Sequence, residues 1–437
     1  TNLFKCFLPR AWANSSVSGI SGFLHPEGIY DDPKGARFRR AVYPRLRAHF
    51  QFINELNLFA EVDHHVKYSI NVYGPNFSKT SFYHLANLFI PQTIDTCFTH
   101  QGAGPVPGIK EEVIQPNSAV KSVWNTRGHR DRIIEVTGHE LELFAKLYDE
   151  IGTDALEARL PALHARQLIG VLEKFAAQPR RLGDLKGEYI SLEMWHETMG
   201  QKDGTIRRET RFPDGPEEWI LSGPHFFVGT PLYKTPREQC TQNSHYDILD
   251  LETLPDDYLS RTNYVPDCDR DTYLDRTPRV PWVVEGDHRG KLVTDYYRHI
   301  LRAMLSQSGE RTLISALAPK NIGHMNGART YTYKTDALLI EHTAMAGSIS
   351  FDFLCKSTGK ANLHQMLDDF SLVAFGDLVD PVRCRELVLS CVTSHYAELW
   401  QSNWQDSFSQ QLWAIREPIA ALPKDFFAKL SPEWQRS

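Results

Sequence analysis

Basic residues gather in the middle of this sequence, at a place where they could bind phosphate. They lie around Gly204, shortly after Trp195 and His196. They are Lys202, Arg207, Arg208, Arg211, Lys234 and Arg237. Basic side chains on a glycine-bearing loop suit phosphate oxygens, and an arginine there suits the two acceptors of a guanine edge. The segment therefore predicts a DNA contact, and the alternative is a solvated loop neutralised by Asp203 and Glu209.

Two other polar segments are candidates for the same contact. One carries Lys320, His324, Asn326 and Arg329, and the other carries Lys356 and Lys360. Composition alone does not rank them against the first segment. The formal net charge of −6 excludes a protein that is basic over its whole surface. Binding to DNA would therefore require a local basic cleft.

The sequence has no pattern typical of a metal site, and we predict none. No two of its seven cysteines have the close spacing of a zinc knuckle. His196-Glu197 lacks the second histidine, one helical turn later, that a zinc hydrolase needs. His64 and His65 follow Asp63, but adjacent side chains of an extended segment point to opposite sides. We therefore expect these two histidines to diverge.

The sequence also lacks the residue patterns of hydrolytic enzymes. Five acidic residues follow His245, but no strand with Glu-x-Lys comes after them, so we interpret them as an acidic loop rather than a nuclease site. They are Asp247, Asp250, Glu252, Asp256 and Asp257. No Gly-x-Ser-x-Gly elbow is present. The cysteines are scattered and odd in number, which indicates reduced thiols in a cytoplasmic protein, and no apolar run approaches the length of a membrane span.

The elements that would position functional side chains are clearest in residues 2–74. Apolar and basic segments alternate there with the periods of helices and strands. The segments are Leu3 to Trp12, Ile20 to Leu24, Ala36 to Arg47, Phe50 to Leu56 and Tyr68 to Tyr73. This pattern predicts helix, strand, helix, strand, turn and strand. Such a unit is typical of the trailing half of an open α/β sheet.

This order resembles the catalytic domain of a TaqI-like, gamma-class DNA adenine methyltransferase, in the half that follows its Asn-Pro-Pro-Tyr loop. The matching features are a strand that ends at Pro26, an arginine-bearing helix over Arg37 to Arg47, and a Leu58-Phe59 turn before the last strand. The resemblance implies that Phe59 stacks on an extruded adenine, since base flipping needs an aromatic face to offset lost stacking. The alternative is that Phe59 is a core residue joining two strands.

Two motifs of that family are missing from the sequence: the glycine-rich loop that grips S-adenosylmethionine, and the Asn-Pro-Pro-Tyr loop. Gln101 to Pro105 is glycine-rich, but Pro105 and Pro107 prevent a helix from opening there. The chain also begins with Thr1, so we expect an excerpt of a longer polypeptide. The resemblance thus implies S-adenosylmethionine as a cofactor bound mainly outside this chain. It also implies a missing N-terminal half-domain as partner, in the same polypeptide or in another subunit, and no catalytic residue in this chain.

We expect an α/β fold followed by mixed α+β structure. Residues 1–74 would be the C-terminal half of a methyltransferase domain, with a Rossmann-like sheet, and residues 75–178 a connector. In the connector, Thr137 and Glu140 form a capping box for helical structure over residues 137–178. Residues 179–375 are rich in short apolar runs and resemble a β-rich target-recognition domain. Residues 376–437 would be a helical segment, with one long helix over 381–405.

Two functions follow from these expectations. The first is part of a DNA adenine methyltransferase that acts on double-stranded DNA in restriction-modification or in BREX- or DISARM-like phage defence. The second is a DNA-binding specificity subunit without catalysis, which the two missing motifs favour. A structural protein that kept the sheet but lost DNA binding is a third reading, and it predicts no affinity for duplex DNA at low salt.

Overall fold

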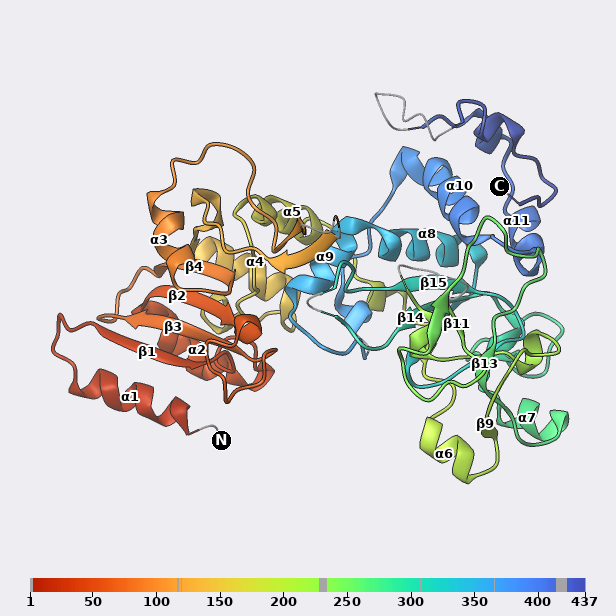
Figure 1. Ribbon diagram of the computed structural model, residues 1–437, viewed down its shortest axis with the longest axis horizontal. Helices are drawn as coiled ribbons and strands as arrows, with labels where there is room; N and C mark the ends of the chain where they lie inside the picture. Colours follow the sequence, from red (N-terminus) through yellow and green to blue (C-terminus); the bar gives the residue numbers. More distant parts are fainter. Residues whose placement is uncertain are drawn as a thin grey trace. The chain divides into compact units, whose positions relative to one another are not determined.

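The computed structural model describes residues 3–115, 118, 120–227, 234–306, 309–364, 366–413 and 423–436. The chain divides into two units (Figure 1). The first unit is Thr1–Pro179 with Ser357–Gly359, and the second is Arg180–Lys356 with Lys360–Ser437. The division at Pro179 lies beside the composition change at residue 179.

The first unit contains seven strands and five helices among its described residues. The strands are β1 (Ser21–Pro26), β2 (Leu46–Ile53), β3 (Lys67–Tyr73), β4 (Ser81–Leu88), β5 (Lys110–Ile114), β6 (Val120–Trp124) and β7 (Ile134–Thr137). The helices are α1 (Phe4–Asn14), α2 (Ala36–Val42), α3 (Gln92–Thr99), α4 (Gly138–Tyr148) and α5 (Gln167–Ala176). Residues 4–73 follow the order helix, strand, helix, strand, turn and strand, as the sequence predicts.

Five of these strands form one mixed sheet in the order β1-β3-β2-β4-β7. Strand β3 is antiparallel to both of its neighbours, so β1 and β2 run in the same direction and are joined by a crossover that contains α2. Strand β4 is parallel to β2, and β7 is antiparallel to β4. Figure 1 shows β1 to β4 side by side in red and orange.

The central strands β2 and β3 have no exposed residue on either face, and the two faces of the sheet differ in chemistry. One face carries an apolar cluster of Phe52, Tyr68, Leu85 and Leu88, to which α3 contributes Cys97. The other face carries buried polar side chains of β1, β2, β3 and β4: His25, His49, Gln51, Ser69, Asn71 and His84. Burial on both faces explains why β2 shows a nearly continuous buried pattern.

The expected boundary between a half-domain at residues 1–74 and a connector at residues 75–178 does not divide the structure. Strand β4 hydrogen-bonds to β2 within the same sheet, so the segment after residue 74 completes the sheet that residues 1–74 begin. The capping box of Thr137 and Glu140 is present at the start of α4. However, residues 137–178 form two helices rather than one helical stretch. Gly152, with φ of +88°, and Pro161 lie between them, and neither suits a helix interior.

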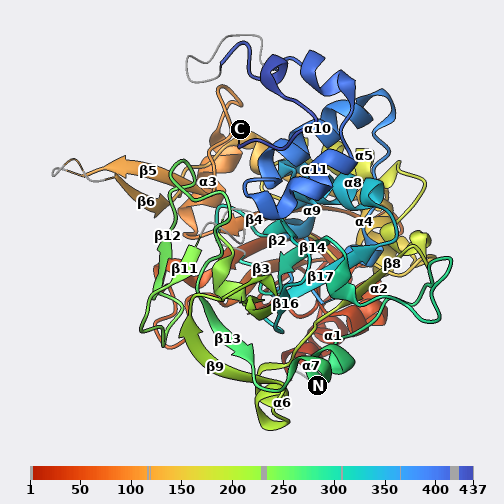
Figure 2. The same cartoon turned by 90° about the vertical axis from the view of Figure 1, so that its right-hand side faces the viewer.

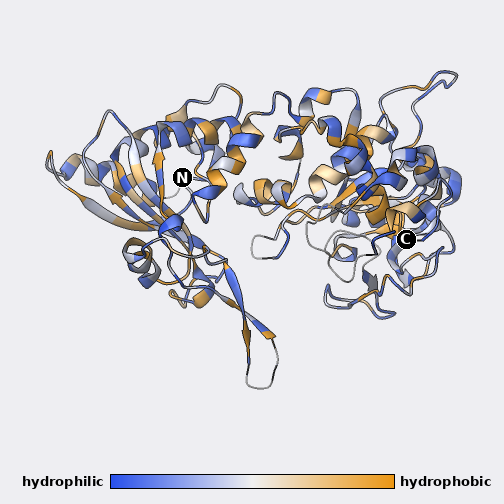
Figure 3. Ribbon diagram, turned by 90° about the horizontal axis from the view of Figure 1, so that it is seen from above, coloured by the Kyte–Doolittle hydropathy of each residue, from blue (hydrophilic) through white to orange (hydrophobic). Residues whose placement is uncertain are grey.

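Strands β5 and β6 form a separate antiparallel ribbon in the first unit. Figure 2 shows this ribbon extending away from the sheet. Figure 3 shows hydrophobic and hydrophilic residues along the ribbon. Val113, Ile114 and Val120 near its end are 43%, 75% and 61% exposed. Such exposure of aliphatic side chains leaves the ribbon without a core of its own.

The second unit contains ten short strands among its described residues. Its strands are β8 (Tyr189–Leu192), β9 (Ile206–Arg211), β10 (Ile220–Leu221), β11 (Lys234–Pro236), β12 (Tyr246–Ile248), β13 (Thr262–Pro266), β14 (Arg298–Arg302), β15 (Ser315–Ala318), β16 (Gly323–His324) and β17 (Ala328–Tyr333). They form a four-stranded sheet, β15-β14-β17-β8, and the pairs β9–β13, β10–β16 and β11–β12. Within the four-stranded sheet, β14 and β15 pair antiparallel.

The helices of the second unit lie mostly in its C-terminal part. They are α6 (Glu197–Lys202), α7 (Arg270–Arg276), α8 (Asp336–Gly347), α9 (Ile349–Ser357), α10 (Val379–Ser390) and α11 (Ala397–Ser402). The single helix predicted over residues 381–405 is wrong, because the chain breaks between α10 and α11. There the amide of Ser394 donates to the carbonyl of Asp256, a partner that sequence periodicity does not reveal.

Two further expectations concern the whole chain. No disulfide joins the seven cysteines, all of which lie in described segments. Among the described helices, none has both the length and the apolar character needed to cross a membrane.

Candidate functional site

The first candidate site lies at the end of the sheet where β1 and β2 have their carboxyl ends. Both strands run antiparallel to β3, so their last residues, Pro26 and Ile53, lie at the same end of the sheet. In open sheets with parallel strands and crossover connections, ligands bind outside the carboxyl ends of those strands. The chain between β2 and β3, residues 54–66, passes over this end of the sheet and is called the Asn54 loop below.

Asn54 fixes the course of this loop. Its side chain is fully buried. Its Nδ2 donates to the carbonyl oxygens of Phe59 and Val62, each at 2.9 Å, and its Oδ1 accepts from the Phe59 amide at 3.0 Å. A buried side-chain amide that binds three backbone groups replaces the hydrogen bonds that a regular element would provide. The loop therefore presents its side chains in a defined arrangement.

Phe59 is held at the surface of this loop. Its ring is 41% exposed and makes an edge-on contact with Tyr68, with 5.0 Å between the ring centroids. Four other apolar side chains of the loop are also more than one-third exposed: Leu56, Leu58, Val62 and Val66. An exposed apolar patch on a loop with a fixed course is typical of a binding surface. The reading of Phe59 as a fully buried core residue is wrong.

A buried polar network lies next to this end of the sheet, and sequence reasoning missed it. Glu27 follows β1 directly, and its carboxylate accepts from Gln51 Nε2 at 2.9 Å and lies 3.1 Å from His49 Nε2. His49 Nδ1 lies 2.8 Å from His84 Nδ1. Tyr30 adds a hydrogen bond to Asn71 Oδ1 at 2.5 Å. The sequence signal for this network was the presence of polar residues within otherwise apolar strands.

The protonation of this network follows from its surroundings. Burial alone would raise the pKa of Glu27, but the His49 charge and hydrogen bonds from His49, Ser69 and Gln51 lower it to about 2. Burial, together with the His49 charge, lowers the pKa of His84 to about 3, so His84 is neutral. Glu27 is 5% exposed and His49 is 1% exposed. Since neither group reaches the surface, we assign them a structural role.

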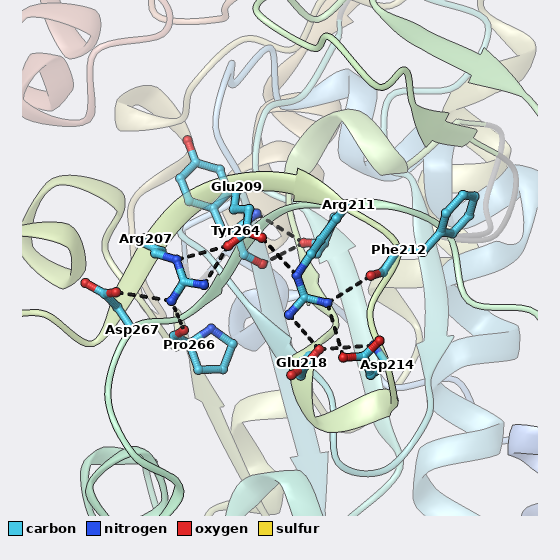
Figure 4. A network of polar contacts seen from close by, with 10 residues as sticks. Arg207, Glu209, Arg211, Phe212, Asp214, Glu218, Tyr264, Pro266 and Asp267 are labelled. Carbon is cyan, nitrogen blue, oxygen red and sulfur yellow. Dashed lines mark hydrogen bonds and ion pairs between the residues drawn. The ribbon is translucent and has the colours of Figure 1, made fainter.

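The basic segment of the second unit is a strand and not the expected loop. Arg207 and Arg211 lie on one side of β9, as alternate positions of a strand do. Arg207 pairs with Glu209 at 2.6 Å and with Asp267 at 3.3 Å. Arg211 pairs with Glu209 and Glu218 (Figure 4). For these two arginines the structure favours the alternative of a charge-neutralised surface.

Arg208 points to the other side of β9 and lines a cavity of about 460 Å³, called the Arg208 cavity below. Its Nη2 donates to the carbonyl of Cys240 at 2.8 Å. Guanidinium and amide side chains dominate the polar part of the lining: Arg208, Arg302, Gln242, Asn243, Asn326 and Asn362. The Arg302 guanidinium has no hydrogen-bond or ion-pair partner within the described part of the chain, so its donors are available to a ligand.

The acidic group of the Arg208 cavity is already engaged. Glu197 accepts a short hydrogen bond from the Tyr264 hydroxyl. Burial raises the pKa of Tyr264, and the hydrogen bond and the charge of Glu197 raise it further. The cavity therefore offers the donors of Arg302 together with amide and hydroxyl groups that can donate or accept.

The other predicted contacts are dispersed. Lys202 is exposed at the end of α6. Lys234 lies over the Phe227 ring at 4.6 Å, and Arg237 pairs with Asp247 at 2.8 Å. Both belong to the β11–β12 hairpin, whose turn residues line the Arg208 cavity. Lys356 Nζ donates to the Gly309 carbonyl at 3.1 Å, and Lys360 is half-buried after α9.

The polar segment from Lys320 to Arg329 contributes one residue to the Arg208 cavity. Asn326 lines it, and its Oδ1 accepts from the Glu197 amide at 3.0 Å. The other three have internal partners or no exposure: Lys320 pairs with Glu398 at 2.6 Å, His324 is fully buried, and Arg329 donates to Ser191 Oγ at 3.0 Å.

The expected divergence of His64 and His65 is wrong. Both residues lie in a turn of the Asn54 loop and not on an extended segment, and their ring centroids are 3.8 Å apart.

Strand β1 is not followed by a glycine-rich loop in the described part of the chain. The segment after β1 continues through Glu27, Asp31 and Asp32 to a short 3-10 turn at Pro33–Gly35, and no glycine-rich loop opens a helix there. The Gln101 to Pro105 segment is also followed by irregular chain.

Comparison with known proteins finds likenesses among solved structures only. No protein-family model matches the chain, and no curated protein matches it. Among solved structures, the chain is similar to the type IIG restriction endonuclease BpuSI, with 11% sequence identity and a TM-score of 0.26. The match covers 92% of this chain and 46% of that one, so the chain spans about half the length of that enzyme. These values are too low to assign a family.

Proposed function

We propose that this chain is the DNA-engaging part of a DNA adenine methyltransferase in a restriction-modification or phage-defence system. The parent enzyme would methylate the exocyclic amine of a flipped adenine with S-adenosylmethionine, which is bound mainly by residues outside this chain. The observation that carries the proposal is the placement of Phe59. Asn54 binds the backbone of Phe59 and so holds this half-exposed residue where the strands β1 and β2 end.

An aromatic ring at this place fits the energetics of base flipping. Extruding a base costs a few kcal/mol of lost stacking and pairing. Stacking on an aromatic side chain returns about 1–3 kcal/mol per base. Phe59 is exposed enough to accept a base, and the hydrogen bonds from Asn54 keep its backbone in place, so little ordering is needed when the base arrives.

The Arg208 cavity supports a reading role for the second unit. Arginine recognises the O6 and N7 acceptors of guanine, and asparagine or glutamine recognises the adenine edge. Both kinds of side chain line this cavity. Arg207 and Arg211 pair with acidic neighbours, so we assign them to holding β9 against its surroundings.

The alternative is a DNA-binding specificity module without catalysis. The sequence favours it because the glycine-rich loop and the Asn-Pro-Pro-Tyr loop are both missing. Both functions need the Arg208 cavity, but only methylation needs Phe59.

The test of the proposed function is methylation in cells. The polypeptide that contains this chain is expressed in a host without adenine methylation, and the host genome is sequenced for N6-methyladenine. We expect methylation at one short sequence. We expect Phe59→Ala to reduce the methylation rate about tenfold or more, because a stacking energy of about 1–3 kcal/mol is lost.

Phe98→Ala is the matched control, since Phe98 is also an exposed ring of the first unit, at 44%, in an edge-on contact with Tyr83. Equal methylation by the Phe59 and Phe98 variants contradicts the stacking role. Sequence-specific DNA binding without any methylation would establish the specificity module.

Arg208 and Arg302 are predicted to read DNA, whereas Arg207 is not. Arg208→Ala and Arg302→Ala should each weaken binding to the specific duplex by about 1–3 kcal/mol and relax its sequence preference. Arg207→Ala should change binding little, because Glu209 and Asp267 already neutralise this guanidinium. Fluorescence anisotropy with specific and scrambled duplexes at several salt concentrations measures both effects. A larger loss for Arg207→Ala than for Arg208→Ala would reverse the assignment.

A further inference from the structure

Three metal-ligating side chains meet on the Asn54 loop. The ligand atoms of Glu55, His64 and His65 all lie within 4.8 Å of one another. His65 Nδ1 lies 3.2 Å from Glu55 Oε1. Glu55 comes from the start of the loop, and the two histidines come from its end, so the three side chains bring the two ends of the loop together.

The turn that carries the two histidines is fixed by its own hydrogen bonds. The His65 amide donates to Asp63 Oδ1 at 2.8 Å, and the Val66 amide donates to the Asp63 carbonyl at 3.1 Å. The other end of the loop is fastened by Asn54 and turns at Asn57, which has φ of +52°. Two histidines on a tight turn point the same way, whereas on a strand they would diverge.

Glu55 gives an independent reason to expect a cation. Its side chain is only 9% exposed, and within the described part of the chain its ion-pair partner is His65, whose own side chain is 65% exposed. A carboxylate shielded from water needs a positive partner. The ion pairs of the described residues include none between Glu55 and a lysine or an arginine, so a bound metal ion would supply the missing charge.

We propose that Glu55, His64 and His65 bind a divalent transition-metal ion of the Zn²⁺ type, with the remaining coordination position open to solvent. Two imidazoles and one carboxylate suit Zn²⁺ or Co²⁺, whereas Mg²⁺ and Ca²⁺ prefer oxygen ligands alone. Bonds of about 2.0–2.2 Å place neighbouring ligand atoms of a tetrahedral site about 3.3–3.6 Å apart. The distance of 3.2 Å between His65 Nδ1 and Glu55 Oε1 is close to this range.

The ion would join the two ends of the loop that carries Phe59. This site differs from the stacking surface, because none of its ligands is the aromatic ring itself. Metal binding therefore stands or falls separately from methyltransferase activity. Its expected effect is to hold the Asn54 loop in the conformation seen in the structure.

Titration of the untagged chain with Zn²⁺ and with Co²⁺ tests the proposal. Calorimetry should show one tight site in the wild type. Glu55→Gln, His64→Gln and His65→Gln should each weaken it at least about tenfold, since even outer-shell partners of metal sites are worth about ten- to a hundredfold. His139→Gln is the matched control and should bind as the wild type does, because His139 is an exposed histidine, 67%, that lies 3.3 Å from Glu173.

The Co²⁺ spectrum of the wild type gives a second measurement that needs no variant. A d–d absorption band without a thiolate charge-transfer band is expected for ligation by nitrogen and oxygen. A thiolate band would place the metal on a cysteine and overturn the proposal. Absence of a Zn²⁺ site in the wild type would overturn it as well, and so would unchanged binding by the His64 and His65 variants.

Discussion

Replacing Glu27 with alanine is expected to lower the free energy of unfolding of the first unit by about 3–5 kcal/mol, the usual cost of removing one member of a buried charge pair. The carboxylate is 5% exposed and holds both His49 and Gln51. Without it, two buried donors lose their acceptor. Glu61→Ala, an exposed neighbour on the Asn54 loop, should change the free energy by less than about 0.5 kcal/mol.

Urea unfolding, followed through the reactivity of the Cys97 thiol, measures this change. Cys97 is fully buried in the apolar cluster of the first unit, so it reacts with a thiol reagent only when that unit opens. Mass spectrometry identifies the labelled cysteine. Equal urea midpoints for the Glu27 and Glu61 variants would show that the network contributes nothing to stability.

The same network predicts an acid sensitivity of the first unit. The pKa of Glu27 in the folded chain is about 2, below its ordinary value of 4.5. The unfolded chain therefore binds more protons between these pH values, and stability falls as the pH drops from 4.5 to 2. The full contribution of about 3 kcal/mol is present above pH 4.5, because each pKa unit corresponds to about 1.4 kcal/mol. Glu27→Ala should lose this part of the pH dependence.

Replacing Glu386 with glutamine is expected to stabilise the second unit at alkaline pH. Glu386 lies on α10, is 9% exposed, and accepts one hydrogen bond from Ser390 Oγ at 2.7 Å. Burial raises its pKa to about 7, and the Ser390 hydrogen bond opposes this only in part. The folded chain therefore keeps a proton that the unfolded chain releases near pH 4.5, and stability falls as the pH rises from 4.5 to 7.

Glutamine has no proton to release, so Glu386→Gln should exceed the wild type in stability by about 2–3 kcal/mol at pH 8 and equal it at pH 4.5. Labelling of Cys384 and Cys391 during urea unfolding reports on this unit, since both thiols are buried in its fold. Glu238→Gln, at an exposed position, is the control and should show no such pH dependence. An equal response of the two variants at pH 8 would contradict the prediction.

Local periodicity was enough to predict the order of the elements of residues 4–73, because each of them has its own apolar pattern. It did not give all of their bounds: the predicted helix to Arg47 ends at Val42, and β2 begins at Leu46 rather than near Phe50. It was also enough for the start of α4, where the Thr137 and Glu140 capping box is contained within four residues. The sheet order was not accessible in this way. Placement of β3 between β1 and β2 depends on pairings between residues far apart in the chain.

The candidate sites show the same limit. In the sequence, the cluster near Gly204 gives no reason to distinguish Arg207, Arg208 and Arg211. In the structure they lie on a strand, where alternate residues face opposite sides, so Arg208 has different surroundings from the other two. The break between α10 and α11 depends on Asp256, more than a hundred residues earlier. Glu27, His49 and His84 come from three different strands or strand ends, so their network has no local signature.

The antiparallel position of β3 also has a consequence for the order in which the first unit assembles. Strand β1 has only β3 as its neighbour within the described sheet, so β1 is joined to the rest of the sheet only through β3. The Asn54 loop must close before β3 can dock, because it is the connection between β2 and β3. Opening of this loop in the native state would therefore release β3 and β1 together, and their amides should exchange with solvent deuterium as one cooperative group.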